Sequence, residues 1–376
     1  MRPWLRFEIL VLLCSVACVS LFTACHKEQK IYLGYAGSLT GRTSELGLAG
    51  RNGAQLAVDE VNRQGGVKGR QVELLVGDNG GHAETAARVT RDLMDSGAVA
   101  IIGHMLSQMS VAALPALENS PVVMVSPTTA TSELSEQDDQ FLRVYPDLRK
   151  LAARLAEHAY RERGLRRMAI VANSDNRAFS EPWADNFSAF FTHEGGQVVS
   201  RKFFANAPQK SLSTTVSAIL RERPDGLLII ASAPDTGLLC QQLRKLGSTL
   251  PVFSSEWSFA GDLLRYGGQS VDGLTLFHSF DLAAKNPRYD RFKQAYQHTF
   301  AAEPGFAAVN SYDAARLTLQ AMEQQHPGEL LKQTLLRQQP FQGLQVSMQL
   351  DQFGDIERPL FLTRIANGRF IRVARP

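Results

Sequence analysis

A serine and a glutamate stand at the ends of two expected strands, where each could bind a charged group. Ser107 follows the expected strand Ala98–Gly103 and begins a helix, so its hydroxyl and the next free backbone N–H groups could hold a carboxylate. Glu256 follows the expected strand Val252–Ser255, and a carboxylate that enters a cleft is costly unless it meets a cation. Ligands of doubly wound sheets bind at this carboxyl end of the strands. The two residues are therefore candidates for binding an anion and a cation.

Each candidate also has a structural alternative. Ser107 can be the N-cap of its helix, and Glu256 can be an exposed surface glutamate. Thr128 and Thr129 follow the expected strand Val122–Ser126 and offer hydroxyls and turn amides to the same region as Ser107. A turn closed by Ser and Thr hydroxyls is the alternative for these two threonines. The residue types alone leave the alternatives open.

The stretch Gly50–Asp78 shows the repeating unit that must position these side chains. Its first half places apolar residues at i, i+3, i+4 and i+7, the spacing of one helix face: Ala54, Ala57, Val58 and Val61. Gly65 and Gly66 follow, where a left-handed helix end needs a residue without Cβ. Arg70–Val76 then reads as a strand that enters a sheet covered on both faces. Helix, glycine turn and buried strand form half of a βαβ unit.

This alternation continues along the chain and predicts an α/β fold with two doubly wound parallel-sheet lobes. The first set of strands is expected at Ile31–Ala36, Gln71–Val76, Ala98–Gly103 and Val122–Ser126. The second set is expected at Met168–Ala172, Val198–Phe204, Gly226–Ala231, Val252–Ser255 and Leu274–Phe277. Helices are expected between the strands, then at Tyr289–Phe300 and Val309–Gln324, and hairpins follow Phe341. No flexible linker separates the sets, so the chain should cross between the lobes through short hinge segments.

The N-terminus reads as an export signal. Arg2 and Arg6 precede an apolar run of about 14 residues, Ile9–Phe22, which is short beside the ~20 residues of a membrane-spanning helix. Small residues directly before Cys25 indicate a bacterial lipobox, so residues 1–24 are the expected signal peptide and Cys25 the acylated residue. Ordinary cleavage without a lipid, or an uncleaved anchor, is the alternative. The expected location is the periplasm or cell surface, with the lipid tethering the protein to a membrane.

Composition excludes several other classes of function. Cys14 and Cys18 fall in the removed segment, which leaves Cys240 as the lone thiol besides Cys25 and argues against a cysteine-based metal site. The net charge is +3 for the full sequence. It becomes +2 when the signal peptide is removed, because Arg2, Arg6 and Glu8 are lost with it. This balance does not suggest a nucleic-acid partner.

No catalytic motif is found either. Neither a dinucleotide-binding nor a P-loop glycine pattern appears, and the nucleophile-elbow and HExxH motifs are absent. His104 lies near Ser107, which allows a nucleophile interpretation, but a loop or core histidine is preferred. The sequence therefore predicts a protein that is not an enzyme, with no cofactor and no metal.

Several segments resemble one known family. They are the stretch 40–78, the segment Gly103–Ser110 (GHMLSQMS) and Val125–Ser135 (VSPTTATSELS). Their order is similar to that of leucine/isoleucine/valine-type solute-binding proteins, type I periplasmic binding proteins that serve ABC importers. The resemblance implies two lobes joined by three hinge crossings, with the ligand held between them. The first lobe would be residues 31–145 plus 280–341, and the second 146–279 plus 342–376.

The resemblance also implies roles for the candidate residues. It places Ser107 at the ligand carboxylate and Glu256 at the α-ammonium, which together suggest an amino acid. The usual threonine of the family falls on Ala130 here, so Thr128 and Thr129 take its role only loosely. Two cleft tyrosines of the family fall on Phe179 and Ser232, and Trp257 either fills the lost volume or is a structural tryptophan.

The expected function is thus that of an exported, lipid-anchored solute-binding protein. It would trap a small ligand, an amino acid by this reasoning, and deliver it to an ABC permease. The alternative is a periplasmic lipoprotein of the same fold that binds a protein partner, such as a cell-wall-synthase activator, and whose cleft is idle. An idle cleft has no need of both Ser107 and Glu256, so these residues separate the two hypotheses.

Overall fold

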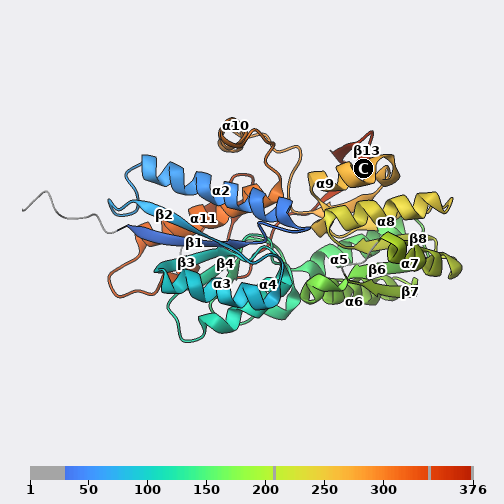
Figure 1. Cartoon of the computed structure of the whole chain (residues 1–376), viewed down its shortest axis with the longest axis horizontal. Coiled ribbons are helices and arrows are strands. Elements are labelled where there is room, and N and C mark those ends of the chain that lie inside the picture. The colour runs from blue at the N-terminus through green and yellow to red at the C-terminus, as the bar shows by residue number, and fades with distance from the viewer. Residues whose placement is uncertain (1–29, 206–208, 338–339, 374–376) are drawn as a thin grey trace, which may run out of the picture.

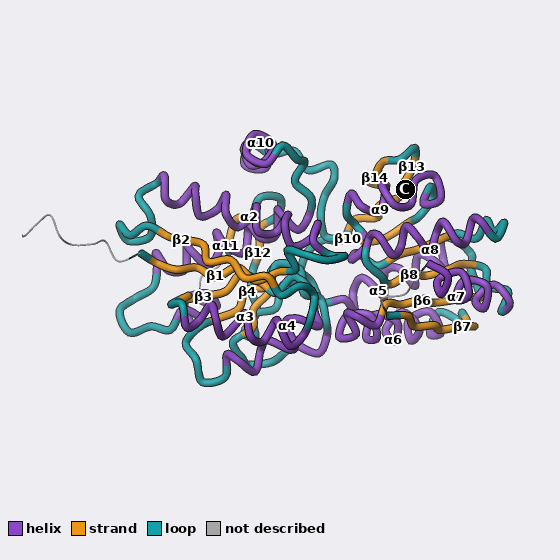
Figure 2. The backbone as a smooth tube through the Cα atoms, viewed as in Figure 1, coloured by secondary structure: helices purple, strands orange, loops and turns teal. Residues whose placement is uncertain are grey.

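The chain folds into two α/β lobes that lie end to end (Figure 1). The computed structural model describes residues 30–205, 209–337 and 340–373. The described chain begins at the end of the first lobe that is far from the second lobe. Figure 2 shows a sheet in each lobe with helices on both of its faces. The predicted fold class, two doubly wound lobes with parallel sheets, is confirmed.

The first lobe is built on a five-stranded parallel sheet with the order β2-β1-β3-β4-β5. Its strands are β1 (Ile31–Gly37), β2 (Val72–Asp78), β3 (Ala98–Gly103), β4 (Val123–Ser126) and β5 (Phe141–Arg143). Helices α2 (Ser44–Arg63) and α11 (Phe306–Gln324) lie together on one face, while α3 (Ala83–Asp95) and α4 (Ser107–Ala113) lie on the other (Figure 1). The lobe also contains α10 (Pro287–Phe300) and α12 (Leu331–Arg337).

The second lobe repeats this topology in a seven-stranded sheet with the order β14-β13-β10-β9-β8-β6-β7. The strands β6 (Arg167–Asn173), β7 (Gln197–Phe204), β8 (Gly226–Ile230), β9 (Val252–Ser254) and β10 (Thr275–His278) are parallel. An antiparallel hairpin, β13 (Phe361–Ala366) and β14 (Arg369–Arg372), extends the sheet from β10. The helices are α5 (Leu148–Glu157), α6 (Arg177–His193), α7 (Gln209–Arg221), α8 (Ala233–Lys245) and α9 (Gly261–Gly267). In both sheets the strand order reverses beside the first strand, which is where such folds bind ligands.

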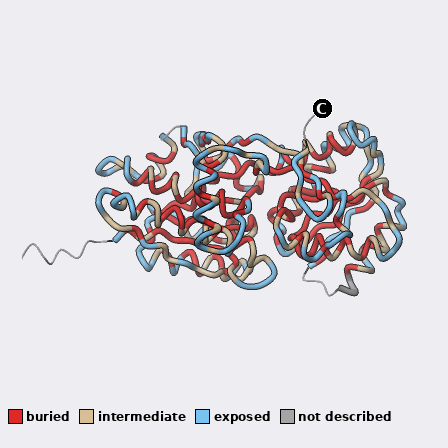
Figure 3. The backbone as a smooth tube through the Cα atoms, turned by 90° about the horizontal axis from the view of Figure 1, so that it is seen from above, coloured by how far each residue is buried: buried red, intermediate tan, exposed pale blue. Residues whose placement is uncertain are grey.

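The core of each lobe is the apolar sheet between its helices, and Figure 3 shows the buried residues gathered in the interior of each lobe. In the first lobe, α2 and α11 approach closely because α2 carries glycine at the crossing. A Cβ on Gly53 would lie 2.0 Å from the carbonyl oxygen of Ala308, too close for any side chain. Gly65 and Gly66, which follow α2, have φ angles of 105° and 81°, as the predicted glycine turn requires.

Three segments of chain cross between the lobes. The first runs from β5 to α5, and the second runs from β10 to α10. The third enters β13, and it lies later than expected. The segment before it still contacts the first lobe, since Leu344 donates its N–H to Asp313 and Asp355 forms an ion pair with Arg143. The expected start of the second lobe at residue 342 is therefore corrected to the neighbourhood of Arg358.

Two elements beside the first crossing were missed by the sequence analysis. Strand β5 has only three residues, and α5 follows it after a short turn. The short strand carries too few residues for an alternating pattern to stand out. The hairpins expected after Phe341 are present as β11 (Phe341–Gln342) with β12 (Ser347–Met348), and as β13 with β14.

Candidate ligand-binding site

A small, partly open cavity lies between the two lobes, where the carboxyl ends of both sheets face each other. Its volume is about 20 Å³, which is the room needed by about one water molecule. First-lobe residues around it come from α2, the β3–α4 loop and the start of α4, the turn after β4, the segment after β5 and α11. Second-lobe residues come from α6, the turn before it and the turn after β9. The lining residues are Leu46, Met105, Leu106, Ser107, Thr128, Tyr145, Asn176, Phe179, Glu256, Trp257 and Phe306.

Ser107 is the first residue of α4, and its hydroxyl is turned to the loop after β4. The helix N-cap is Leu106, and no side chain caps this end. The Oγ of Ser107 accepts hydrogen bonds from the backbone N–H groups of Ala130 and Thr131, each at 3.3 Å. Since these bonds use the lone pairs of the hydroxyl, its proton is available to a carboxylate. The N-cap alternative for Ser107 is therefore wrong.

The two threonines of the loop after β4 have different positions. Thr128 lines the cavity, and its hydroxyl donates to the carbonyl oxygen of Met105 at 2.5 Å. Thr129 is fully buried, and its Oγ1 lies 2.7 Å from the Oγ of Ser110 inside the first lobe. Of the pair, the structure brings only Thr128 to the cavity. The side chain of Thr129 holds the loop against α4.

Glu256 enters the cavity from the second lobe. It begins a short 3-10 turn after β9 and is only 3% exposed. Its Oε2 accepts a hydrogen bond from the indole N–H of Trp183 at 3.0 Å, whereas its Oε1 has no partner among the described residues. Burial raises the pKa of this carboxyl group to about 7. A buried carboxylate with one free oxygen is suited to a cationic group of a ligand.

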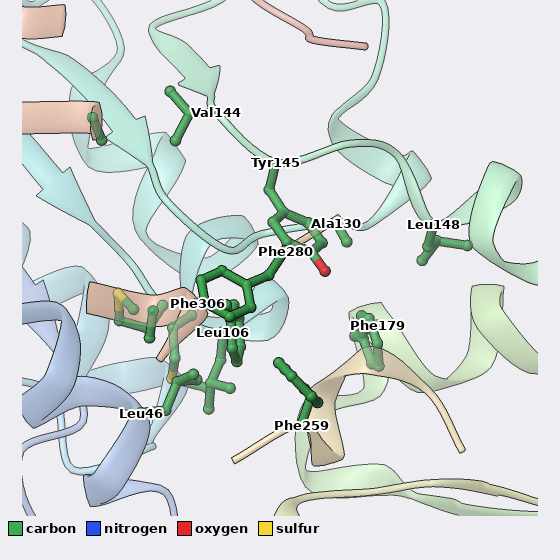
Figure 4. Close-up of a cluster of buried hydrophobic side chains, with 14 of the residues drawn as sticks. Leu46, Leu106, Ala130, Val144, Tyr145, Leu148, Phe179, Phe259, Phe280 and Phe306 are labelled. Atoms are coloured by element: carbon green, nitrogen blue, oxygen red, sulfur yellow. The ribbon is translucent and has the colours of Figure 1, made fainter. Parts of the chain in front are cut away.

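Aromatic and aliphatic side chains form the remaining walls. The rings of Phe179 and Trp257 meet edge to face with their centroids 5.8 Å apart. Figure 4 shows Leu46 and Phe306 of the first lobe opposite Phe179 of the second, all within one apolar cluster. Most of the surface that surrounds the two polar groups is therefore hydrophobic.

Ser232 does not reach this cavity. It is the N-cap of α8, where its hydroxyl donates to Oδ2 of Asp235 at 2.8 Å and accepts from the N–H of the same residue. It lines a second space of about 20 Å³ between the lobes, which shares Leu46 and Trp257 with the first. Its contact with the ligand stays a prediction.

Polar contacts also tie the lobes together around the cavity. Glu45 of α2 accepts the N–H groups of Gly261 and Asp262, the first residues of α9, at 2.9 Å each. Arg42 forms an ion pair with Asp235 across the same gap. The sequence analysis missed these contacts because each joins residues that are far apart in the chain.

A third contact of this kind lies on the other side of the cavity. The N–H of Gln108, in α4, donates to Oδ1 of Asn176 at 2.9 Å. The Oε1 of Gln108 accepts from the N–H of Ala178 at 3.0 Å. A glutamine and an asparagine thus bridge α4 and the start of α6, and Asn176 lines the cavity as well.

The residues weighed for chemistry have structural partners. His104 is fully buried, with its ring nitrogens 2.8 Å from Nδ2 of Asn79 and 2.9 Å from Oγ1 of Thr90, so it does not pair with Ser107. Burial lowers the pKa of this histidine to about 3. Cys240 is buried in α8, and burial raises its pKa to about 12.

The described ranges contain neither a metal-binding cluster nor a membrane-spanning helix. No group of three or more His, Cys, Asp or Glu side chains there could hold a metal ion. None of the helices in that part of the chain is long and apolar enough to cross a membrane. Cys25 and the expected signal peptide, residues 1–24, lie outside the described residues.

Comparison with known proteins gives a family match and several relatives. The model of a family described as periplasmic binding protein matches residues 30–369. The Leu/Ile/Val-binding protein BraC3 of Rhizobium johnstonii is 26% identical over 274 residues, which are 72% of this chain and 73% of that protein. The Leu/Ile/Val-binding protein of Escherichia coli is 25% identical over 324 residues, which are 84% and 86% of the two chains.

Solved structures give the same result. The leucine-binding protein LivK from Thermotoga maritima is 26% identical, with a TM-score of 0.85 and coverage of 92% of this chain and 98% of that chain. LivJ from Streptococcus pneumoniae, solved with isoleucine, has a TM-score of 0.84 at 19% identity. The match covers 92% of this chain and 100% of the LivJ chain, and it supports the fold. The resemblance stated from the sequence is confirmed.

Proposed function

Since the chain belongs to the periplasmic binding protein family, we propose that it is an exported solute-binding protein of an ABC importer with an amino acid as its ligand. The relatives support this class of ligand, because two of them are Leu/Ile/Val-binding proteins and a similar structure was solved with isoleucine. Their identities of 26% and below leave the side chain of the ligand to be argued from the site itself.

The observation that carries the proposal is the buried carboxylate of Glu256, which lines the cavity with one oxygen unpartnered among the described residues. Keeping such a group in a mostly apolar space is costly without a cation. The ammonium group of an amino acid would supply this cation. On the opposite lobe, the hydroxyl proton of Ser107 is free to bind the ligand carboxylate.

The walls of the cavity favour a neutral, apolar side chain. Leu46, Phe179, Trp257 and Phe306 offer no charge to a ligand. A charged side chain buried there would lack a partner, whereas an aliphatic or aromatic one would gain about 25 cal/mol for each Å² of apolar surface removed from water.

Binding requires the lobes to move. A space of about 20 Å³ is far too small for an amino acid, so the ligand must enter when the lobes are apart. Because the ligand would contact Ser107 on one lobe and Glu256 on the other, it would favour the closed arrangement by its differential affinity. Closure of this kind would present the loaded form to a permease.

The direct test is isothermal titration of the ligand-free protein with leucine, isoleucine, valine, phenylalanine, alanine and threonine. We expect at least one of these amino acids to bind. The Glu256→Gln variant should weaken its affinity at least ~100-fold, because the ammonium group of the ligand would lose a buried charged partner. Glu84→Gln, at an exposed glutamate of α3, serves as the matched control and should bind normally. If no amino acid binds, the proposal fails, and the partner-binding alternative takes its place.

The lipid anchor and the permease are further parts of the proposal. We expect Cys25 to carry the lipid, so the full chain should fractionate with membranes and incorporate labelled palmitate. The Cys25→Ser variant should lose both properties while its soluble part binds ligand normally. The loaded protein should stimulate ATP hydrolysis by its cognate permease, and Glu256→Gln should not. If the wild-type protein carries no labelled palmitate and is found in the soluble fraction, the proposed lipid anchor is wrong, but the proposed ligand binding is unaffected.

A further inference from the structure

A wide groove lies on the first lobe and shares no residue with the cavity between the lobes. It is bordered by α10, α2 and α11, and its volume is about 870 Å³. Figures 1 and 2 show α10 standing above α2 and α11. We call it the α10 groove.

One face of each helix lines the groove, and the three faces together carry four arginines and a histidine. On α10, Arg288, Arg291 and His298 fall at i, i+3 and i+10, a spacing that places them on one side of a helix. Arg316 of α11 and Arg63 of α2 complete the set. Arg316 is half-buried, while the other three arginines are exposed.

The groove has a fixed shape because α10 is anchored at two points. The rings of Phe292 and Tyr312 lie 4.9 Å apart, which joins α10 to α11. The Tyr312 hydroxyl donates in turn to Oε2 of Glu60 on α2. Arg288 donates to the carbonyl oxygen of Gln342, which fixes the start of α10. Packing therefore sets the positions of the helices that carry the cationic side chains.

The positive charge in the groove is only partly neutralised from within, since its lining carries four arginines and one carboxylate, that of Glu60. None of the four arginines forms an ion pair with any of the described residues. Glu60 is the one acidic side chain that lines the groove there, and it already accepts the hydroxyl proton of Tyr312. Four guanidinium groups around one concave space repel one another, and an anion bound among them would relieve this repulsion. Their planar N–H pairs match the oxygens of phosphate groups.

We propose that the α10 groove binds a small polyanion that carries two or more phosphate groups. Cations supplied by three helices around about 870 Å³ are spread too widely for a single phosphate to reach them together. A flat membrane surface could contact the exposed arginines of α10 but would not enter the groove as far as Arg316. This site is separate from the site proposed for the amino acid. If the groove does not bind a polyanion, the function proposed for the cleft is unaffected.

The test uses sodium tripolyphosphate as the probe, titrated calorimetrically into the mature chain at low ionic strength in a phosphate-free buffer. We expect saturable binding with one site, and an affinity that falls as salt is added because the contacts are charged. The double variant Arg288→Glu/Arg291→Glu should weaken binding at least ~10-fold and leave amino-acid binding in the cleft unchanged.

The matched control is Arg88→Glu/Arg91→Glu on α3, where two exposed arginines have the same i, i+3 spacing and the variant makes the same change in net charge. Equal losses in both double variants, or no saturable binding by the wild type, would overturn the proposal. If Arg288→Glu/Arg291→Glu fails to fold, Arg291→Glu is compared with Arg88→Glu under the same criterion. Binding of the wild type to anionic vesicles, but not to tripolyphosphate, would also overturn it in favour of a lipid surface.

Discussion

The indole N–H of Trp183, in α6, donates a hydrogen bond to Oε2 of Glu256, in the turn after β9, at 3.0 Å. Both residues belong to the second lobe and both are buried. The bond occupies one carboxylate oxygen, so the other oxygen is the one left for a ligand. Trp183 is itself held in place by Phe187, whose ring stacks on it with centroids 6.1 Å apart. A tryptophan that lies outside the lining of the cavity thus orients the glutamate within it.

We expect Trp183→Phe to weaken amino-acid binding about 10-fold, because the carboxylate would lose a hydrogen bond that orients it. Hydrogen bonds to charged groups contribute roughly 1.5–3 kcal/mol. The measurement is calorimetric titration. Phe187→Leu is the control, since it disturbs the same stack and keeps the bond. A Trp183→Phe protein that binds as tightly as the wild type would show that Glu256 needs no such support.

Ligand binding should depend on pH through Glu256. Its pKa of about 7 in the described form means that the free protein is largely protonated at this position at pH 5. An ammonium ion requires the charged carboxylate, so affinity should rise about tenfold per pH unit below pH 7 and then level off. Titrations at pH 5 to 7.5 in buffers of different ionisation enthalpy should detect the release of up to one proton. A flat affinity profile would contradict the assignment.

The same group should shape the pH dependence of stability. Between the ordinary value of 4.5 and the raised value of about 7, the folded chain holds a proton on Glu256 that the unfolded chain has released. The contribution of this group to stability therefore falls as the pH rises through this window and stays low above it. Glu256→Gln should remove this contribution. The comparison of urea melts of the two proteins at pH 5 and pH 8 checks it.

Closure should depend on Glu45, which supplies the cap of a helix in the opposite lobe. Ala260, the N-cap of α9, offers no side-chain acceptor, and Glu45 binds the first two amides of that helix instead. Glu45→Ala should shift the ligand-free protein towards an open form and weaken ligand binding by roughly 10-fold. Small-angle X-ray scattering should show a larger radius of gyration. The control Glu84→Ala should change neither quantity.

The hinge should be sensitive to Arg358, the buried cation of the third crossing. Its Nη1 donates to the carbonyl oxygen of Val144 in the first crossing and to Oδ1 of Asn310 in α11. Burial raises the pKa of Asp313 to about 7, and the positive charge of Arg358 opposes this rise. Arg358→Met should cost about 3 kcal/mol of unfolding free energy, because buried acceptors and a buried acid lose their cation.

The double variant Arg358→Met/Asp313→Asn should recover part of this loss, because the uncompensated acid is removed. A double-mutant cycle from urea melts measures the coupling between the two residues. Additive losses would mean that Arg358 acts on the hinge backbone alone.

The family and the order of the elements could be predicted from sequence because both are encoded locally. One helix and its end can be predicted from a short segment: the helical spacing of Ala54, Ala57, Val58 and Val61, followed by two glycines. This prediction does not depend on the rest of the chain. Buried strands such as β3 and β8 can likewise be predicted, because they are apolar runs in the sequence. Ser107 and Glu256 could be selected because each lies within a few residues of the end of such a strand and matches a ligand-binding position of the resembled family.

Tertiary structure decided which polar groups are free. Thr129 and Ser232 have the same kind of hydroxyl as Ser107, yet one bonds within the first lobe and the other caps α8. Trp183, Glu45 and Arg358 acquire their roles from partners far away in the chain, and no local pattern marks them. The sequence by itself determined the elements and the residue types at the strand ends. The fold decided which of those residues face the cavity, because hydrogen-bond partners and burial arise only when distant segments pack together.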